Sequence, residues 1–232
     1  MKLLTKNQLK ILAIVCMTLD HIGAALFPQA VWLRVIGRLA FPLFSYCIAE
    51  GCRYTRNKAR YFGSVFACGA VCVIAFLPFG GFCGNALITL SMSILLLYGM
   101  EAWKSSGKLR FLALTAALAA VFYLLCRTVY IDYGFAGVLL PVYAAAGRLL
   151  WERVFADIPP VIGERLGFAV GLLALAGVMG GVQRFCVLAI FPILLLGNER
   201  GKWKMQHFFY IYYPAHLAVI GAVRMALEAA AG

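Results

Sequence analysis

The sequence predicts an all-α integral membrane protein with about nine transmembrane helices and one interfacial amphipathic helix. Of its 232 residues, 64% are hydrophobic and only 13% are charged, and the mean hydropathy is +0.90. This composition excludes an ordinary soluble domain. The composition changes little along the chain, and no linker, repeat or low-complexity segment interrupts it. We therefore expect a single domain over residues 1–232.

Nine apolar runs predict the helices, since about 20 apolar residues are needed to cross a bilayer. The runs cover residues 9–27, 31–51, 61–79, 85–103, 109–126, 133–150, 164–181, 184–197 and 208–227. The first is not expected to be a cleaved signal peptide, because Asp20 and His21 interrupt it and no small-residue cleavage site follows. The eighth is short enough to be re-entrant instead. The aromatic residues that open the ninth predict an interface belt.

The basic residues predict the orientation of these helices. If alternate loops face the same side, sixteen of the 21 Lys and Arg residues gather on one side and three on the other, with two inside the second run. The positive-inside rule places the first side, and the N-terminus, in the cytoplasm; an odd number of helices places the C-terminus outside. Topology and attraction to anionic lipids then account for the net charge of +12, and no nucleic-acid partner is expected.

Residues 147–158 show the pattern of an amphipathic helix. At 100° per residue, apolar side chains such as Leu150 and Val154 fall on one arc, and charged ones such as Arg148 and Glu152 fall on the other. A Pro-Pro pair follows directly. We expect this segment to lie on the cytoplasmic membrane surface.

Asp20 and His21 are the strongest pointers to function. A carboxylate and an imidazole inside an apolar run cost several kcal/mol each, roughly, unless they face a partner or a polar cavity. Arg34 and Arg38 are four residues apart and share one face of the second helix. Because arginine does not lose its charge, Arg38 needs a partner at this depth, and Asp20 is the expected one. Pro42 also frees the backbone carbonyl of residue 38 as an acceptor.

His21 is expected to work with a group on another helix, because adjacent side chains on a helix diverge by about 100° and Asp20 is therefore turned away from it. His216, in the ninth run, is a further imidazole in an apolar segment and, after His21, the second candidate for a base. Four further polar residues, expected to orient a substrate, lie toward the outside: Asn85, Thr89, Asp132 and Tyr133.

A second polar group lies at the cytoplasmic ends of the helices and contains Arg53, Arg56, Asn57 and Arg200. Guanidinium groups match phosphate oxygens, so these residues are candidates for holding a phosphate-bearing cofactor. The alternative is that they only follow the positive-inside rule. No Cys or His spacing indicates a metal site.

Six segments carry a resemblance to a known family. They are LTKNQLKILAIVCMTLDHIGAALFP (4–28), LRVIGRLAFPLFSYCIAEGCRYTRN (33–57), NALITL (85–90), DYGFAGVLLP (132–141), NERGK (198–202) and YIYYPAHL (210–217). Together they resemble the TraX family, named for the F-pilin acetylase, and the second segment is the most specific. The matches extend from one end of the chain to the other, although the third, fifth and seventh runs carry little.

The resemblance implies a multi-pass acyltransferase of a bacterial plasma membrane that takes an acetyl group from cytoplasmic acetyl-CoA. His21 would act as general base on a hydroxyl or amine of the acceptor. Arg38, held by Asp20, and Asn85 would stabilise the oxyanion or orient the acceptor. The cytoplasmic arginines would hold the CoA phosphates. Besides membrane lipids, the partner is an acceptor that the sequence does not identify: a glycan, a lipid or a protein amine.

A proton-coupled transporter is the alternative from another class. In that interpretation Asp20, His21, Asp132 and His216 relay protons across the membrane. Release of free CoA from acetyl-CoA separates the two.

Overall fold

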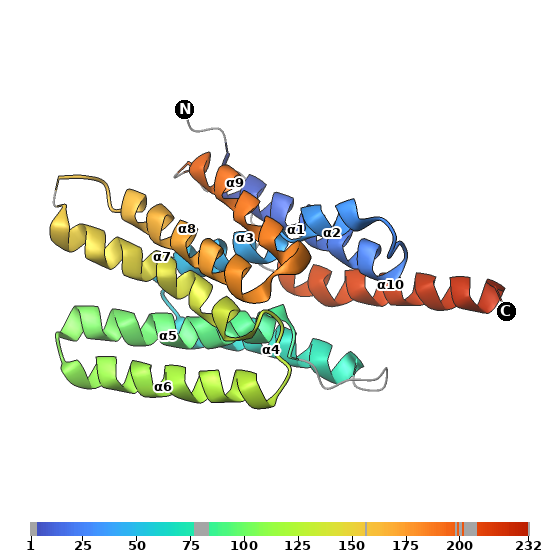
Figure 1. Ribbon diagram of the computed structural model, residues 1–232. Coiled ribbons are helices and arrows are strands. Elements are labelled where there is room, and N and C mark those ends of the chain that lie inside the picture. The colour runs from blue at the N-terminus through green and yellow to red at the C-terminus, as the bar shows by residue number, and fades with distance from the viewer. Residues whose placement is uncertain are drawn as a thin grey trace. The chain divides into compact units, whose positions relative to one another are not determined.

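The protein is helical throughout the part of the chain that the computed structural model describes (Figure 1). That part comprises residues 4–76, 84–155, 157–197, 199, 201 and 208–231. The chain divides into two compact units. One, the terminal unit, joins Met1–Phe44 with Met179–Gly232; the other, the central unit, is Ser45–Val178.

The terminal unit contains α1 (Lys6–Ala25), α2 (Val31–Gly37), the start of α3 (Ala40–Tyr54), the 3-10 helix η2 (Gly181–Ala189), α9 (Ile190–Leu194) and α10 (Phe208–Ala231). A capping box begins α1: the Gln8 backbone N–H donates to Thr5 Oγ1, and the Thr5 backbone N–H donates to Gln8 Oε1. Helix α1 then packs against α2 and α10.

A break separates α2 from α3 at residues 38 and 39. Pro42 lacks an N–H, so it cannot donate to the carbonyl of residue 38, as the sequence predicts. Helix α2 comes very close to α1 just before this break. A Cβ on Gly37 would lie 2.2 Å from Asp20 Oδ1, which is too close for any side chain. The absence of a side chain at Gly37 therefore leaves the space that the Asp20 carboxylate occupies.

The segment η2–α9 runs alongside much of α1. At one end, Gln183 reaches Arg38, which binds Asp20. At the other end, Leu196 forms an isolated parallel bridge with Leu4. The part of α1 between its start at Lys6 and Asp20 is about 21 Å long, at about 1.5 Å per residue. Since a 3-10 helix rises about 2.0 Å per residue, the fourteen residues of η2–α9 reach about 25 Å.

The central unit contains the rest of α3 with α4 (Lys58–Phe76), α5 (Ala86–Ser106), α6 (Leu109–Thr128), α7 (Gly134–Val154) and α8 (Val161–Met179). Helix α5 packs against α4, α6 and α7 (Figure 1). Met92, Phe122 and Val138 belong to their shared core. Close approach at glycines joins α7 to α8: a Cβ on Gly167 would lie 2.3 Å from the carbonyl oxygen of Tyr143.

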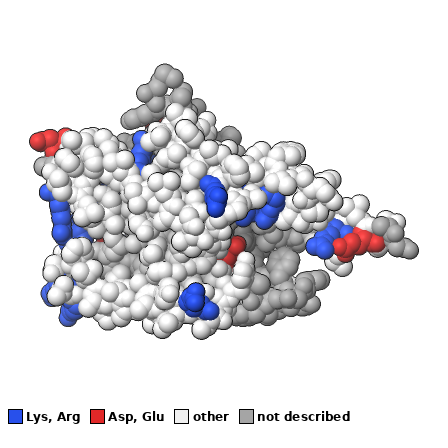
Figure 2. Space-filling model, viewed as in Figure 1, with Lys and Arg blue, Asp and Glu red and all other residues white. Residues whose placement is uncertain are grey.

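Within the described residues, seven helices are long and apolar enough to cross a membrane: α1, α2 with α3, α4, α5, α6, α7 and α8. The expected count of nine is not confirmed, because α10 is not among them and η2–α9 is a shorter apolar segment. Apolar side chains face outward on these helices, as Leu114 and Leu124 of α6 do with exposed fractions of 64% and 61%. The face drawn in Figure 2 is correspondingly uncharged over most of its area.

The separate amphipathic helix expected at 147–158 is wrong. Helix α7 continues without a break to Val154 and is capped by Phe155. The charged arc of this segment does not face water alone, because Arg148 and Glu152 bind charged side chains of α5 and α8. The apolar arc is the end of a helix that is long and apolar enough to cross a membrane.

We expect the N-terminus to be cytoplasmic and the C-terminus to lie outside. The backbone contact of Leu4 with Leu196 puts the end of α9 on the side of the N-terminus, so that α10 must start from that side. Fusing a cytoplasmic fluorescent reporter and an external phosphatase reporter to each end tests this. Phosphatase activity at residue 232 is the expected result. An active fluorescent reporter at both ends would instead make η2–α9 or α10 re-entrant.

Candidate functional site

A buried carboxylate between two arginines forms the centre of the terminal unit. Asp20 is 8% exposed. Arg38 donates through Nε to Asp20 Oδ1 over 3.2 Å, and its Nη2 contacts both carboxylate oxygens. Arg34 Nη1 lies 3.0 Å from Oδ2 and also donates to the backbone oxygen of Asp20 over 2.9 Å. The predicted ion pair of Asp20 with Arg38 is therefore present, with Arg34 as a second cation.

Gln183 of η2 extends this group. Its Oε1 accepts a hydrogen bond from Arg38 Nη1 over 2.9 Å. Because arginine only donates, this contact fixes which way the amide is turned and directs Nε2 elsewhere. Gln183 is 6% exposed, and its Nε2 is buried without an oxygen or nitrogen acceptor in the described part of the chain. The Cys186 thiol on η2 interacts with the Gln183 side chain, but a thiol is only a weak acceptor. The site therefore contains a buried N–H donor for which an oxygen atom would be a stronger acceptor than the group it now faces.

His21 and His216 meet directly. His21 Nδ1 lies 2.8 Å from His216 Nε2, and the ring centroids are 5.0 Å apart. His216 is 7% exposed, whereas His21 is only partly buried. As predicted, His21 turns away from its neighbour Asp20 and toward a group on another helix, α10.

The hydrogen bonds determine where the protons of this pair lie. His216 Nδ1 is 2.9 Å from the backbone oxygen of Tyr212, which only accepts, so Nδ1 carries a proton. If both rings are neutral, His216 Nε2 is then an acceptor and His21 donates to it from Nδ1. His21 Nε2 is left with its lone pair. The geometry therefore makes His21, and not His216, the imidazole with an available basic nitrogen.

Tyr212 holds the pair in place from α10. Its ring stacks on that of His216, with centroids 5.2 Å apart and an interplanar angle of 7°. Its hydroxyl is 2.7 Å from Thr18 Oγ1, which itself donates to the backbone oxygen of Ile14, so Tyr212 donates to Thr18. The sequence predicts an interface belt at Tyr212 and does not predict its contact with His216.

Asn85, Thr89, Asp132 and Tyr133 come together in the central unit. Asn85 caps α5 through Oδ1 and donates from Nδ2 to the backbone oxygen of Gly69 over 2.8 Å. Thr89 is fully buried and donates to the backbone oxygen of Asp132 over 2.5 Å. Tyr133 caps α7 with a positive φ of 63°. These contacts join the start of α5 to the start of α7. Orientation of a substrate by these residues stays a prediction.

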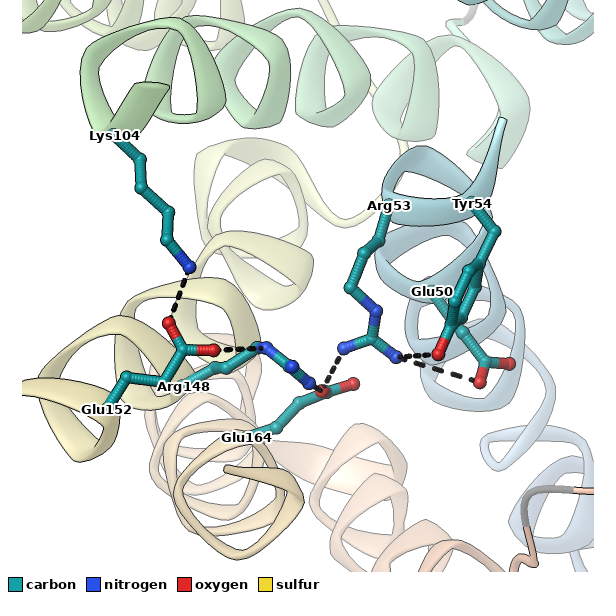
Figure 3. Close-up of polar contacts among 7 residues, drawn as sticks. All are labelled: Glu50, Arg53, Tyr54, Lys104, Arg148, Glu152 and Glu164. Atoms are coloured by element: carbon teal, nitrogen blue, oxygen red, sulfur yellow. Dashed lines mark hydrogen bonds and ion pairs between the residues drawn. The ribbon is translucent and has the colours of Figure 1, made fainter. Parts of the chain in front are cut away.

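A network of charges joins α3, α5, α7 and α8 in the central unit (Figure 3). Its centre is the Glu164 carboxylate, 3% exposed, which accepts from Arg53 Nη1 over 2.5 Å and from Arg148 Nη1 over 3.1 Å. Arg148 also donates to Glu152, which binds Lys104. Glu164 was not a predicted site residue. The sequence signal that could have identified Glu164 is a lone carboxylate near the start of a long apolar run.

The predicted cofactor-binding residues are not alike in this structure. The Arg53 guanidinium contacts Glu164, Glu50 and the Tyr54 ring, whose centroid is 4.7 Å away. Arg56 is exposed. Asn57 caps α4 by accepting from the Arg60 backbone N–H over 2.9 Å. Arg200 lies outside the described residues. In the described part of the chain, no group of three His, Cys, Asp or Glu side chains is placed to hold a metal ion.

We expect single replacements of Asp20 and Arg38 to destabilise the protein more than the double replacement does. Removal of one partner leaves a buried charge uncompensated, at a cost of about 3–5 kcal/mol. Asp20→Asn, Arg38→Gln and the combined variant are compared by thermal unfolding in detergent. The control is the exposed pair Arg224–Glu228, whose removal is expected to be silent. A double variant less stable than either single one contradicts the expectation.

Comparisons with known proteins cover most of the chain. The chain is 28% identical to the probable fimbrial assembly protein FimC, serogroup H1, of Dichelobacter nodosus, covering 95% of this chain and 96% of that protein. It is 24% identical to Protein TraX of Escherichia coli, over 95% and 87% of the two chains. A shorter match, 50% identical over 56 residues, is to the uncharacterized protein RP591 of Rickettsia prowazekii.

No solved structure matches the chain. The family model described as TraX protein matches residues 5–224, which includes all the residues of the terminal and central sites described above. The protein therefore belongs to the TraX family.

Proposed function

We propose that the protein is an acetyl-CoA-dependent acetyltransferase that modifies a hydroxyl or amine at or beyond the membrane. The observation that carries the proposal is the His21–His216 pair, which leaves His21 Nε2 as a basic nitrogen. A general base must be within reach of the acceptor and able to take its proton, and a partly exposed imidazole in this tautomer satisfies the second requirement.

The proposed reaction has two proton transfers. His21 Nε2 takes the proton of the acceptor hydroxyl or amine, whose oxygen or nitrogen forms a bond to the thioester carbonyl carbon. The carbonyl oxygen becomes an oxyanion. The C–S bond then breaks, the acetyl group stays on the acceptor, and the proton passes from His21 to the CoA thiolate. His216 holds His21 in the required tautomer, and Tyr212 holds His216.

Gln183 is the donor that we assign to the oxyanion. Its Nε2 is buried with only the weak acceptor Cys186 beside it, and a donor that is already in place stabilises developing charge without reorganisation. Arg38 contributes by position: it holds the amide by its oxygen and is itself held by Asp20. Asn85, the other predicted oxyanion donor, uses its amide to cap α5 and to bind Gly69.

The CoA phosphates are assigned to the exposed Arg56 on the cytoplasmic side, with Asn57 shaping the loop beside it. Arg200, which lies outside the described residues, stays a candidate from the sequence alone. Arg53 is a weaker candidate than the sequence suggests, because Glu164 already binds its guanidinium. The acceptor is proposed to be a subunit of a surface fibre, since one relative is named as a fimbrial assembly protein.

His21→Ala is expected to lower acetyl transfer by about 10²- to 10⁴-fold, since this is what a general base contributes. The measurement is release of CoA from labelled acetyl-CoA by purified protein with a membrane extract. Acetyl-CoA binding is measured in parallel and should be retained. His207→Ala, the remaining histidine, is the control and should be nearly silent.

Two results would contradict the assignment of His21. A rate above about a tenth of normal in His21→Ala would place the base elsewhere. No CoA release by the unaltered protein, together with uptake of protons in vesicles, would favour the transporter in which the same two histidines relay protons.

Gln183→Glu separates the two roles that Gln183 can have. The carboxylate keeps an acceptor for Arg38 Nη1 and removes the N–H donor. If the donor binds the oxyanion, transfer should fall by about 10²- to 10³-fold while the unfolding temperature is retained. If Gln183 only holds Arg38, transfer should be close to normal. Both quantities are measured on the same preparation.

A further inference from the structure

A cavity of about 240 Å³ lies in the central unit where the end of α5 meets the end of α7. Its lining residues are Trp103, Lys104, Gly107, Leu149, Glu152 and Arg153. Gly107 caps α5 with a φ of 66°, and a Cβ there would meet no atom within 4 Å. The cavity is therefore open at this corner. None of its residues belongs to the site proposed for acetyl transfer.

The cavity has an excess of positive charge. Its carboxylate, Glu152, binds Lys104 through one oxygen and Arg148 through the other (Figure 3). Arg148 also binds Glu164, so it is shared between two carboxylates, but Glu152 keeps it as a partner when Lys104 turns to another anion. The Arg153 guanidinium lies over the Trp103 ring, 5.1 Å from its centroid. Two cationic groups, one from each helix, thus line the cavity with a single carboxylate that is already paired.

Apolar side chains surround this charged group. Leu109, Leu150 and Val154, which neighbour the lining residues in sequence, have exposed fractions of 72%, 63% and 67%. They belong to the ends of α6 and α7, both of which are long enough to cross a membrane. Tryptophan beside such a boundary is typical of the membrane interface. In Figure 2 basic side chains gather at the left edge, over the ends of α5, α6 and α7.

We propose that this cavity binds the phosphate of an anionic phospholipid headgroup, with the lipid chains lying against the exposed apolar side chains. Lys104 and Arg153 would contact the phosphate oxygens. The apolar surroundings favour a lipid over a soluble phosphate compound, because a soluble ligand leaves Leu150 and Val154 uncovered.

The same loop supplies a matched control. Lys108 lies between α5 and α6, and Arg110 lies in the first turn of α6. This pair carries the same charge as Lys104 with Arg153, but it does not line the cavity. Arg110 lies over the Phe111 ring instead, at 4.9 Å. If basic loops were attracted to an anionic membrane surface without a specific site, removal of either pair of cations would weaken lipid binding equally.

The test uses the full chain in phosphatidylcholine nanodiscs that contain a small fraction of brominated phosphatidylglycerol or of brominated phosphatidylcholine. Bromine quenches tryptophan fluorescence, and Trp103→Phe identifies the signal from the cavity. We expect stronger quenching by phosphatidylglycerol. Lys104→Gln with Arg153→Gln should lower this preference by about fivefold or more, and Lys108→Gln with Arg110→Gln should leave it unchanged. Glu152→Gln should raise the preference, a change that misfolding does not produce.

Three results would overturn the proposal. They are equal quenching by the two lipids, an equal loss in the control pair, and a preference that inorganic phosphate at millimolar concentration abolishes. The last would assign the cavity to a soluble phosphate. All three are independent of acetyl transfer.

Discussion

The Asp20 carboxylate between Arg34 and Arg38 is the interaction on which the terminal unit depends. A buried acid with two guanidinium partners is stable only if all three are held in place, because each partner that is lost leaves a charge in an apolar environment. This requirement explains the missing side chain at Gly37, since any Cβ there would occupy the position of the carboxylate. It also sets the rotation of α1, which turns His21 toward α10.

The central unit also contains a buried carboxylate that is paired with two arginines, but there the pairing connects helices. This carboxylate is Glu164, and its two arginine partners come from two other helices. Here no basic nitrogen lies beside the acid, and the network extends instead through Arg148 and Glu152 to the end of α5 (Figure 3). One unit therefore presents a base and a donor, and the other connects helices at their charged ends.

The sequence predicts a contact when a residue has few candidate partners and these are close to it in the chain. Asp20 and Arg38 are eighteen residues apart, and the permanent charge of arginine at that depth requires an acid. The transmembrane character and the direction of His21 follow from composition and helical geometry. Gln183 could not be found in this way, since its partner Arg38 lies 145 residues away. Glu164 has one distant partner, Arg53, and one near partner, Arg148, so its pairing with Arg148 was within reach of the same reasoning. The error at residues 147–158 arose because helical periodicity does not show whether a helix has left the membrane.

The terminal unit is built from the two ends of the chain, Met1–Phe44 and Met179–Gly232, and this has a consequence for its biosynthesis. Asp20 can meet Arg38 soon after both have left the ribosome. His21 must wait for His216, which is 195 residues further along and takes about 10–40 s to be made at ordinary elongation rates. Until α10 has been made, His21 of the nascent protein therefore lies beside the paired Asp20 but lacks its own partner, His216. Premature termination between α3 and α10 yields a polypeptide that still pairs Asp20 with Arg38 and has no partner for His21.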